Sequence, residues 1–258
     1  MAKRRNWTED EFIVVFNLYL KTPFGKMDSR NPEIIKMAEL VGRTPSAIAM
    51  RLVNFASVDP FHQNRGIKGL EGGKKQCKPI FDRFINDKEN LLYESEIILA
   101  KLEGQEIEQK FRQELFLDIS QYQGLTKERV VKTRVNQNLF RNIILSNYNT
   151  KCAISEIDIP TLLVASHIKP WSEDKDNRLN PSNGICLNNL YDKAFDRGLI
   201  GIGSDYSVIF SDKLKTEHKK EYFIKYFKPI EEKKLILPDR FLPEVKFLEY
   251  HLENCFNR

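Results

Sequence analysis

The apolar residues at the start of the chain recur with the period of a helix. Those spaced i, i+3, i+4 along this stretch are Phe12, Val15, Phe16, Tyr19 and Leu20. This spacing predicts a helix over residues 7–20. Thr8, followed three residues later by Glu11, predicts that the helix begins with a capping box.

Two shorter helices are predicted to follow, over residues 32–40 and 45–54. Each starts at a proline, which suits the first turn of a helix, and Gly42 between them suits a helix end. Three short helices in this order make a helix-turn-helix arrangement. We therefore expect an N-terminal helical domain.

The Trp7-Thr8-Glu9 start and the third helix resemble the Myb-like class of DNA-binding helical triads. This resemblance implies contact with DNA. Arg43 and Arg51 lie off the apolar face of the third helix and are candidate DNA-binding residues. A protein-docking role and a purely structural role remain the alternatives.

The next two stretches are predicted to connect this domain to the rest of the chain. Residues 65–78 are rich in Gly and Lys, which predicts a basic linker or loop. Residues 80–117 combine helical apolar spacing with many acids, which predicts a long connecting helix.

In the second half of the chain the pattern changes to short strands interspersed with helices. The predicted elements are a helix ending near 147–149, a strand over 161–165, a strand from 183, a helix over 190–198, strands over 199–202 and 206–211, and a helix over 244–256. The expected fold class is therefore α+β.

The composition is that of a folded chain with one large domain or two small ones. The chain has 258 residues, of which 41% are hydrophobic and 11% aromatic, more than a disordered chain carries. No stretch approaches about 18 consecutive apolar residues, so no membrane span is predicted. The basic start lacks the apolar core of a signal peptide, and we expect a cytoplasmic protein.

The net charge of +5 is unevenly distributed. Residues 1–78 carry 14 Lys and Arg against 8 Asp and Glu, residues 79–123 carry 5 against 10, and residues 124–258 carry 22 against 18. Two basic segments on either side of an acidic one favour a nucleic-acid-binding protein. A set of solvated helix faces is the alternative.

The residues that carry chemistry follow residue 134. The order strand, strand, helix places His167 at the end of one strand, Asn183 at the start of the next and Asp192 on the helix. The motif reads Ala165-Ser166-His167-Ile168-Lys169-Pro170-Trp171, then Asn183-Gly184-Ile185-Cys186-Leu187, then Phe195-Asp196-Arg197-Gly198. In this order it resembles the HNH endonuclease superfamily, in the branch found in prokaryotic restriction-type HNH proteins. The resemblance implies a C-terminal nuclease domain built on a ββα-metal finger.

By this resemblance His167 is the general base, and Asn183 braces the hairpin and helps to hold that base. A neutral histidine, with an ordinary pKa near 6.5, can accept a proton near neutral pH. Asp192 occupies the metal-ligand position and Asp196 is a second candidate ligand, for Mg²⁺ or Mn²⁺. A surface role for Asp192, a structural bond for Asp196 and plain turn chemistry at Asn183 are the alternatives.

Four basic residues in or beside the motif are candidate contacts to DNA phosphates. Lys169 and Arg197 lie within the motif, and Arg134 and Arg141 lie in the basic lead-in over residues 124–151.

The motif departs from the family pattern in two ways. Many HNH enzymes place an acid just before the catalytic histidine, where this chain has Ser166, so a backbone carbonyl or water is expected to help hold the metal. Many relatives also bind structural zinc through four cysteines, but the corresponding places read Cys152-x-x-Ser155 and Cys186-x-x-Asn189. Two thiolates are too few for a closed tetrahedral site, so we expect no structural zinc and apolar packing around both cysteines.

These features predict a divalent-metal-dependent DNA endonuclease that acts in restriction or defence against foreign or modified DNA. The expected domains are a DNA-recognition domain over residues 1–78, an acidic helical linker over 79–123 and the nuclease domain with a C-terminal cap over 124–258. Cutting both strands of a duplex needs two active sites, so a homodimer is expected. The alternatives are a non-catalytic DNA-binding regulator with a degenerate finger and a nuclease that acts on RNA.

Overall fold

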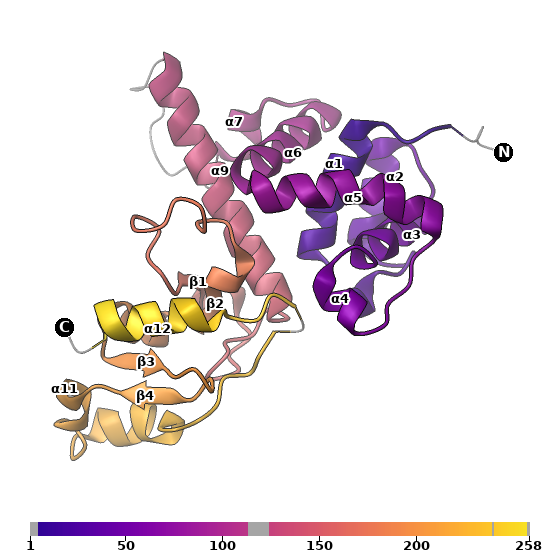
Figure 1. Ribbon diagram of the computed structural model, residues 1–258. Coiled ribbons are helices and arrows are strands. Elements are labelled where there is room, and N and C mark those ends of the chain that lie inside the picture. Colours follow the sequence, from indigo (N-terminus) through magenta and orange to yellow (C-terminus); the bar gives the residue numbers. More distant parts are fainter. Residues whose placement is uncertain (1–4, 113–123, 239, 257–258) are drawn as a thin grey trace. The chain divides into compact units, whose positions relative to one another are not determined.

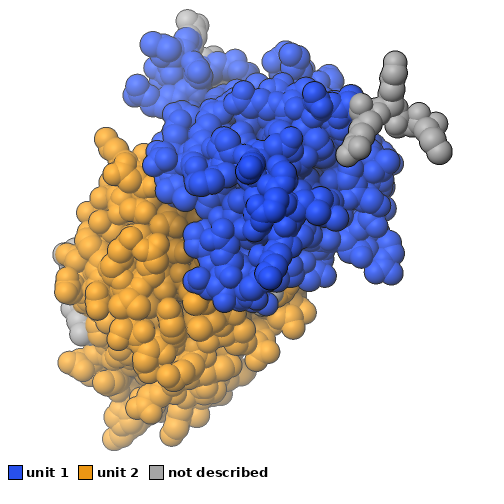
Figure 2. Space-filling view, turned by 45° about the vertical axis from the view of Figure 1, so that its right-hand side comes forward, with its two compact units in different colours: residues 1–139 blue, residues 140–258 orange. Residues whose placement is uncertain are grey.

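The computed structural model describes residues 5–112, 124–238 and 240–256 of the chain. The chain divides into two compact units, residues 1–139 and residues 140–258, which Figure 2 draws in different colours. The division falls within a long helix, α9 (Gly124–Asn147).

The first unit is built from helices (Figure 1). In chain order, its elements before α9 are α1 (Glu9–Lys21), η1 (Phe24–Lys26), α2 (Pro32–Val41), α3 (Pro45–Ala56), α4 (Pro60–Asn64), α5 (Glu71–Asn86), α6 (Lys88–Leu102) and α7 (Ile107–Lys110). The three helices predicted over residues 7–20, 32–40 and 45–54 are confirmed as α1, α2 and α3. The capping box of α1 is also present, because the side chains of Thr8 and Glu11 each accept a hydrogen bond from the other's backbone amide. The helix-turn-helix identity of this triad stays a prediction.

Aromatic side chains form the core of the first unit. The ring centroid of Phe16 in α1 lies 5.0 Å from that of Phe55 in α3, and 6.1 and 5.2 Å from those of Phe81 and Phe84 in α5. Helix α5 therefore belongs to the same core as α1 and α3.

The basic stretch predicted as a linker or loop over residues 65–78 is helical from Glu71 onward, which corrects that prediction. The helix forms despite two adjacent glycines because tertiary packing outweighs intrinsic helix propensity. A Cβ atom at Gly73 would lie 2.3 Å from Nδ2 of Asn54, so a larger residue there would force the Asn54 side chain or α5 to shift.

The acidic stretch is not one long connecting helix either, since α5 ends at Asn86 and a separate helix, α6, follows. Helix α6 packs against α1. The side-chain Nδ2 of Asn17 in α1 donates hydrogen bonds to Ser95 Oγ and Glu96 Oε1 of α6 at 2.5 and 3.0 Å. Part of the predicted linker thus contributes to the first unit's core. Residues 113–123 of that linker lie outside the described residues, and the domain boundaries at 78 and 123 stay a prediction.

The second unit combines two short hairpins with helices, in agreement with the α+β class (Figure 1). After α9, its elements are η3 (Pro160–Leu162), β1 (Leu163–His167), η4 (Pro181–Asn183), β2 (Gly184–Asn188), α10 (Asn189–Asp196), β3 (Ile200–Ile202), β4 (Val208–Phe210), α11 (Asp212–Lys215), η5 (Phe223–Phe227), η6 (Lys228–Ile230) and α12 (Val245–Asn254). Strand β1 pairs antiparallel with β2, and β3 pairs antiparallel with β4. The predicted order strand, strand, helix is confirmed as β1, β2 and α10.

The last helix, α12, fixes the end of α10. The ring of His251 in α12 stacks on that of Phe195 in α10, with centroids 3.7 Å apart and an interplanar angle of 4°. His251 Nε2 lies 3.0 Å from the Phe195 carbonyl oxygen. The turn that follows needs Gly198, because its φ is +63° and a Cβ atom there would lie 2.1 Å from the Cys255 carbonyl oxygen.

Within the ranges that the structure describes, none of the helices combines the length and the apolar character that a membrane crossing requires.

Candidate active site

The hairpin of β1 and β2 carries His167 at its end, directly opposite Gly184. A Cβ atom at Gly184 would lie 2.6 Å from both Phe140 Cζ and Ile144 Cδ1, so the missing side chain leaves room for helix α9. Phe140 fills this space and stacks on the His167 ring, with centroids 4.0 Å apart and an interplanar angle of 12°. The ring of the candidate base is therefore held in one plane.

A hydrogen bond fixes the tautomer of His167. Its Nε2 lies 2.9 Å from the backbone carbonyl oxygen of Arg178. A carbonyl only accepts, so Nε2 carries the proton and the neutral ring has its lone pair on Nδ1. Within the described part of the chain Nδ1 makes no hydrogen bond, which leaves it available as a proton acceptor.

The surroundings of His167 favour its neutral form. Burial lowers the pKa of His167 below its ordinary value of 6.5, and the hydrogen bond to the Arg178 carbonyl opposes this only in part. The imidazole is accordingly neutral at pH 7, which is the state that a general base requires.

Asn183 braces the loop that joins the two strands. Its Oδ1 accepts a hydrogen bond from the Lys169 amide at 2.8 Å, and its Nδ2 donates to the carbonyl oxygens of Lys169 and Asn177 at 3.1 and 3.3 Å. The backbone carbonyl of Asn183 also accepts from the Ile168 amide at 3.0 Å. This side chain is buried, and its hydrogen bonds hold the residues next to His167.

Helix α10 presents the two candidate metal ligands. The Asn188 side chain caps its start by accepting a hydrogen bond from the Tyr191 amide at 3.0 Å. The carboxylates of Asp192 and Asp196 lie one helical turn apart, and the Asp196 side chain is 46% exposed. Partial burial and the neighbouring charge of Asp192 raise the pKa of Asp196 above its ordinary value, against the smaller opposing effects of Lys193 and Arg197.

This pair of carboxylates fits a hard divalent cation. Their mutual repulsion, seen in the raised pKa of Asp196, is what a bound cation relieves, and oxygen is the donor that Mg²⁺ and Mn²⁺ prefer. Among the described residues no three His, Cys, Asp or Glu side chains gather in a cluster suited to a metal. Backbone, water or substrate oxygens would therefore complete the coordination shell.

Ser166, which stands where many HNH enzymes carry an acid, is buried, and its Oγ has no hydrogen-bond partner in the described part of the chain. Successive side chains of a strand face opposite sides, so Ser166 and His167 point away from one another. The hydroxyl adds no ligand beside the histidine.

The two cysteines of the family's zinc positions are both buried. Cys152 Sγ accepts hydrogen bonds from the backbone amides of Ser155 and Asn188 at 3.4 and 3.2 Å. The side-chain Nδ2 of Asn188 donates to Ser155 Oγ at 2.8 Å. Burial, followed by the nearby Cys152, raises the pKa of Cys186 to about 12. Neutral hydrogen bonds thus join Cys152 and Ser155, two of the four family zinc positions, to Asn188, the residue before the fourth position.

The basic residues predicted near the motif have different surroundings. Arg197 is exposed beside Asp196, and Arg134 is exposed on α9 with Gln137 as partner. Arg141 donates to the carbonyl oxygens of Leu163 and Pro160 at 2.6 and 2.9 Å and so holds the start of β1.

Lys169 is held by neighbours on two sides. It pairs with Asp174 at 3.2 Å, and its Nζ lies 4.5 Å from the centre of the Tyr250 ring.

Arg43 and Arg51 belong to the first unit and are engaged in its packing. Both guanidinium groups lie over the Trp7 ring, 4.5 and 4.4 Å from its centroid. Arg43 also pairs with Glu11 at 2.8 Å, and Arg51 is only 7% exposed. Their contact with DNA stays a prediction, and the structure gives both a packing role that the sequence did not reveal.

Two contributors to the candidate site are absent from the sequence-based prediction. The Arg178 carbonyl oxygen carries no side-chain signal, and Phe140 reads in the sequence as an ordinary apolar residue of a helix. The one hint was Gly184, since a glycine in a strand often marks the close approach of another group.

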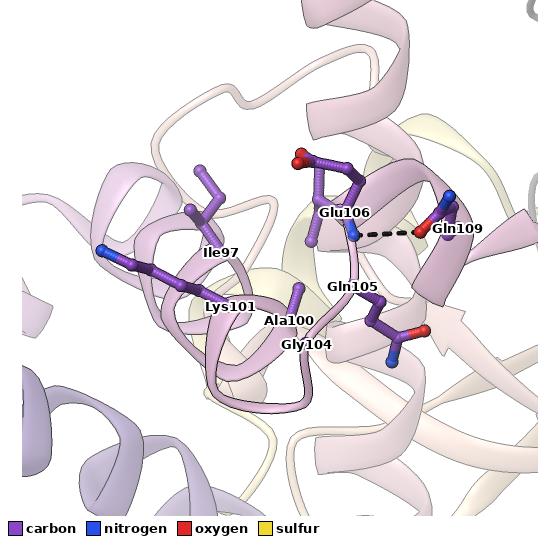
Figure 3. A pocket seen from close by; sticks show the side chains of 8 residues that line it. Ile97, Ala100, Lys101, Gly104, Gln105, Glu106 and Gln109 are labelled. Carbon is purple, nitrogen blue, oxygen red and sulfur yellow. Dashed lines mark hydrogen bonds between the residues drawn. The ribbon is translucent and has the colours of Figure 1, made fainter.

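A separate hollow of about 630 Å³ lies where α6 ends and α7 begins (Figure 3). Its lining includes Lys101, Glu106 and Gln109, and the Glu106 amide donates to the Gln109 side chain at 3.2 Å. Among the described residues that line it there is no histidine, cysteine or aspartate, so the hairpin remains the candidate site.

A comparison with protein families agrees with this location. Residues 152–203, which contain β1, β2, α10 and β3, match the family model described as HNH endonuclease. This segment therefore belongs to the HNH superfamily, and the family description associates it with nuclease chemistry on nucleic acid. No curated protein matches the chain significantly.

Proposed function

We propose that the chain is a divalent-metal-dependent endonuclease that hydrolyses phosphodiester bonds in double-stranded DNA. The observation that carries this proposal is the state of His167. Its ring lies against Phe140, its Nε2 is tied to the Arg178 carbonyl oxygen, and its Nδ1 has no partner in the described part of the chain. A half-buried, neutral and oriented imidazole at the end of an HNH hairpin is suited to general-base catalysis.

In the proposed reaction, Nδ1 of His167 accepts the proton of the water that attacks phosphorus. The resulting imidazolium is stabilised by its hydrogen bond to the Arg178 carbonyl. Asn183 contributes by holding the loop next to the histidine, so that the ring does not reorient as the proton is transferred.

Asp192 and Asp196 hold the metal ion in this proposal. When bound, Mg²⁺ or Mn²⁺ supplies positive charge that stabilises the leaving oxygen. The carboxylates must be ionised to bind it, and Lys193 and Arg197 favour the ionised form of Asp196.

The basic residues divide into proposed DNA contacts and positioning residues. Arg197 and Arg134 are exposed and are assigned to phosphates. Lys169 is assigned to a phosphate that takes the place of Asp174. Internal contacts hold the other three basic residues. Arg141 is assigned to holding the start of β1, and Arg43 and Arg51 are assigned to packing on Trp7.

The biological role that suits such an enzyme is restriction or defence against foreign or modified DNA. Its first unit supplies recognition in this proposal. A duplex has two strands to cut, so a homodimer is proposed, and sedimentation of the full chain with and without DNA tests it.

The deciding experiment incubates the full chain with supercoiled plasmid in the presence of Mg²⁺ or Mn²⁺. We expect nicked and linear product, none in EDTA, and a loss of about 100-fold or more in His167→Gln, which is the scale of general-base catalysis. Asp192→Asn tests the metal position, and Asp205→Asn is its matched control because Asp205 is exposed and pairs with Lys234. Equal cutting by the wild type and His167→Gln would refute the role of His167.

The same preparations separate the two other functions. Tight DNA binding without cleavage under either metal would indicate a DNA-binding regulator. Faster cleavage of an RNA of the same sequence would indicate an RNA nuclease. Parallel digestion of unmodified and base-modified genomic DNA tests the restriction role.

A further inference from the structure

The segment after β4 presents lysines that lack acidic partners. Between residues 213 and 228 the chain carries six lysines and two glutamates, a net charge of +4. The exposed lysines of this segment, which we call the lysine face, are Lys213, Lys215, Lys219, Lys220, Lys225 and Lys228. None of them forms an ion pair within the described residues.

Other lysines of the second unit have acidic partners. Lys169, Lys193, Lys234 and Lys246 each pair with a nearby carboxylate, whereas the exposed Lys151 and Lys175 stand singly and form no ion pair among the described residues. A solvated surface usually intersperses both signs of charge, as those pairs do. A run of unpaired lysines instead creates a local positive potential that attracts a polyanion.

Exposed aromatic and apolar groups are interspersed among these lysines. Tyr222, Ile224 and Tyr226 are 45%, 53% and 44% exposed. The Lys225 Nζ lies 5.2 Å from the centre of the Tyr226 ring. Positive charge combined with accessible aromatic rings is the arrangement by which proteins hold the phosphates and the bases or sugars of nucleic acids.

The lysine face is anchored to the helix that carries the candidate metal ligands. The Tyr191 hydroxyl of α10 donates to the Tyr226 carbonyl oxygen at 2.8 Å, and the Tyr191 and Phe227 rings lie 6.3 Å apart. The Phe223 and Phe227 rings pack on Phe210 of β4 with centroids 5.8 and 6.3 Å away. The face therefore has a fixed place relative to Asp192 on the same helix.

We propose that the lysine face is a second nucleic-acid contact, which binds the phosphate backbone beyond the bond that is cut. This inference rests on the proposed nuclease function. It adds to that function a binding surface outside the residues that match the HNH family model, which end at 203. The two acids of the segment, Glu217 and Glu221, are already counted in its net charge of +4, so the lysines outweigh them.

The test measures binding without cleavage. Fluorescence anisotropy of a labelled 30-base-pair duplex is followed in EDTA, with the full chain carrying Lys225→Gln and Lys228→Gln. The matched control carries Lys234→Gln and Lys246→Gln, which removes the same charge from lysines that have acidic partners. All four residues are exposed, so unfolding midpoints are expected to remain unchanged.

We expect the lysine-face variant to bind about tenfold or more weakly at 0.1 M salt, and the control to bind within twofold of the wild type. A plot of log affinity against log salt has a negative slope, and its magnitude should decrease by about 0.9 for each lost phosphate contact. The expected decrease in the lysine-face variant is therefore nearly 2. Equal effects in both variants, or none in either, overturn the proposal.

Two further arms identify the ligand. Single-stranded DNA of the same sequence replaces the duplex, and a comparable loss of affinity for it would support a contact to the phosphate backbone, which both forms share. Phosphatidylserine vesicles replace DNA in the other arm, and a loss of vesicle binding with unchanged DNA binding would overturn the proposal in favour of a membrane contact. Because binding is read without metal, these outcomes are independent of whether the wild type cleaves DNA.

Discussion

The two units bury their polar groups in different ways. In the first unit, charges are paired: Glu11 lies 2.8 Å from Arg43, and Glu96 lies 3.1 Å from Lys110. In the second unit, His167 and His251 each stack on a phenylalanine and direct Nε2 to a backbone carbonyl oxygen. Ion pairs therefore contribute to the first interior and stacked histidine rings to the second, although the first unit also buries His62 and the second also buries Arg240.

The comparison also separates the two histidines of the second unit. His251 is fully enclosed, and its Nδ1 has no partner among the described residues, whereas His167 stands at the end of the hairpin and is partly exposed. The same ring stacking and carbonyl contact therefore serve packing at one position and are suited to proton transfer at the other. The two positions differ in that Nδ1 of His167 is accessible, whereas Nδ1 of His251 is enclosed.

The difference between the units predicts that acid destabilises them in different pH ranges. Burial lowers the pKa of His251 to about 4, against its carbonyl hydrogen bond, so the unfolded chain binds a proton first as the pH falls below 6.5. For Glu11, burial acts to raise the pKa, but hydrogen bonds from Arg43, the Thr8 amide and Arg5 outweigh it and lower the pKa. Stability from Glu11 is therefore retained until the pH falls through the ordinary range of a carboxyl group, about 4.3.

The largest predicted effect is a loss of stability in the second unit between pH 7.5 and about 4. His251 alone accounts for about 3 kcal/mol, because its pKa of about 4 lies below the ordinary 6.5. Urea unfolding followed by Trp171 fluorescence in Trp7→Phe reports the second unit, and Trp7 fluorescence in Trp171→Phe reports the first. His251→Phe, which keeps an aromatic ring against Phe195, should flatten most of the pH dependence. A first unit that weakens equally over this range would contradict the comparison.

A smaller effect is expected when the buried charge of the first unit is removed. Glu11→Gln should cost about 2 kcal/mol at pH 7, because Arg43 loses its charged partner. The deficit relative to the wild type should shrink as the pH falls below about 4.3, where the unfolded wild-type chain takes up a proton, and should vanish once the folded carboxylate is protonated as well. Glu9→Gln is the matched control, since the Glu9 side chain is 73% exposed, and a change within about 0.5 kcal/mol is expected there.

The smallest effect is expected when the guanidinium of Arg43 is replaced by an ammonium group. This change tests whether Arg43 stabilises the first unit or binds DNA. Arg43→Lys keeps the charge but loses the planar fork that bonds Glu11 and the Asn6 carbonyl oxygen. We expect a loss of about 1 kcal/mol in urea unfolding of the first unit. DNA affinity should stay within twofold of the wild type. A clear loss of DNA affinity at unchanged stability would instead restore the DNA contact predicted from the sequence.

What the sequence predicted well depends on neighbours along the chain. The capping box of Thr8 and Glu11 is a pattern over four residues, and the strand, strand, helix order follows from apolar runs around His167 and Asp192. Both are specified locally, and both are found.

What it could not predict depends on pairing across the fold. Counts of charge do not show that Arg43 and Arg51 enclose Trp7. The Gly- and Lys-rich composition around Gly73 likewise predicted a loop where the structure has a helix. The packing of α5 against Asn54 is a tertiary effect that composition does not show. The orientation of His167 depends on a backbone carbonyl 11 residues away in sequence, and a backbone atom has no identity in a sequence.

The position of Phe140 limits how this nuclease segment can be transplanted. The family match begins at residue 152, but the ring that steadies His167 comes from α9, before that boundary. A chimaera that inherits residues 152–203 alone would carry every motif residue, yet Gly184 would face whatever helix the host supplies. The segment that should be transferred as a unit is therefore the finger together with the end of α9. A fusion point should lie before Phe140.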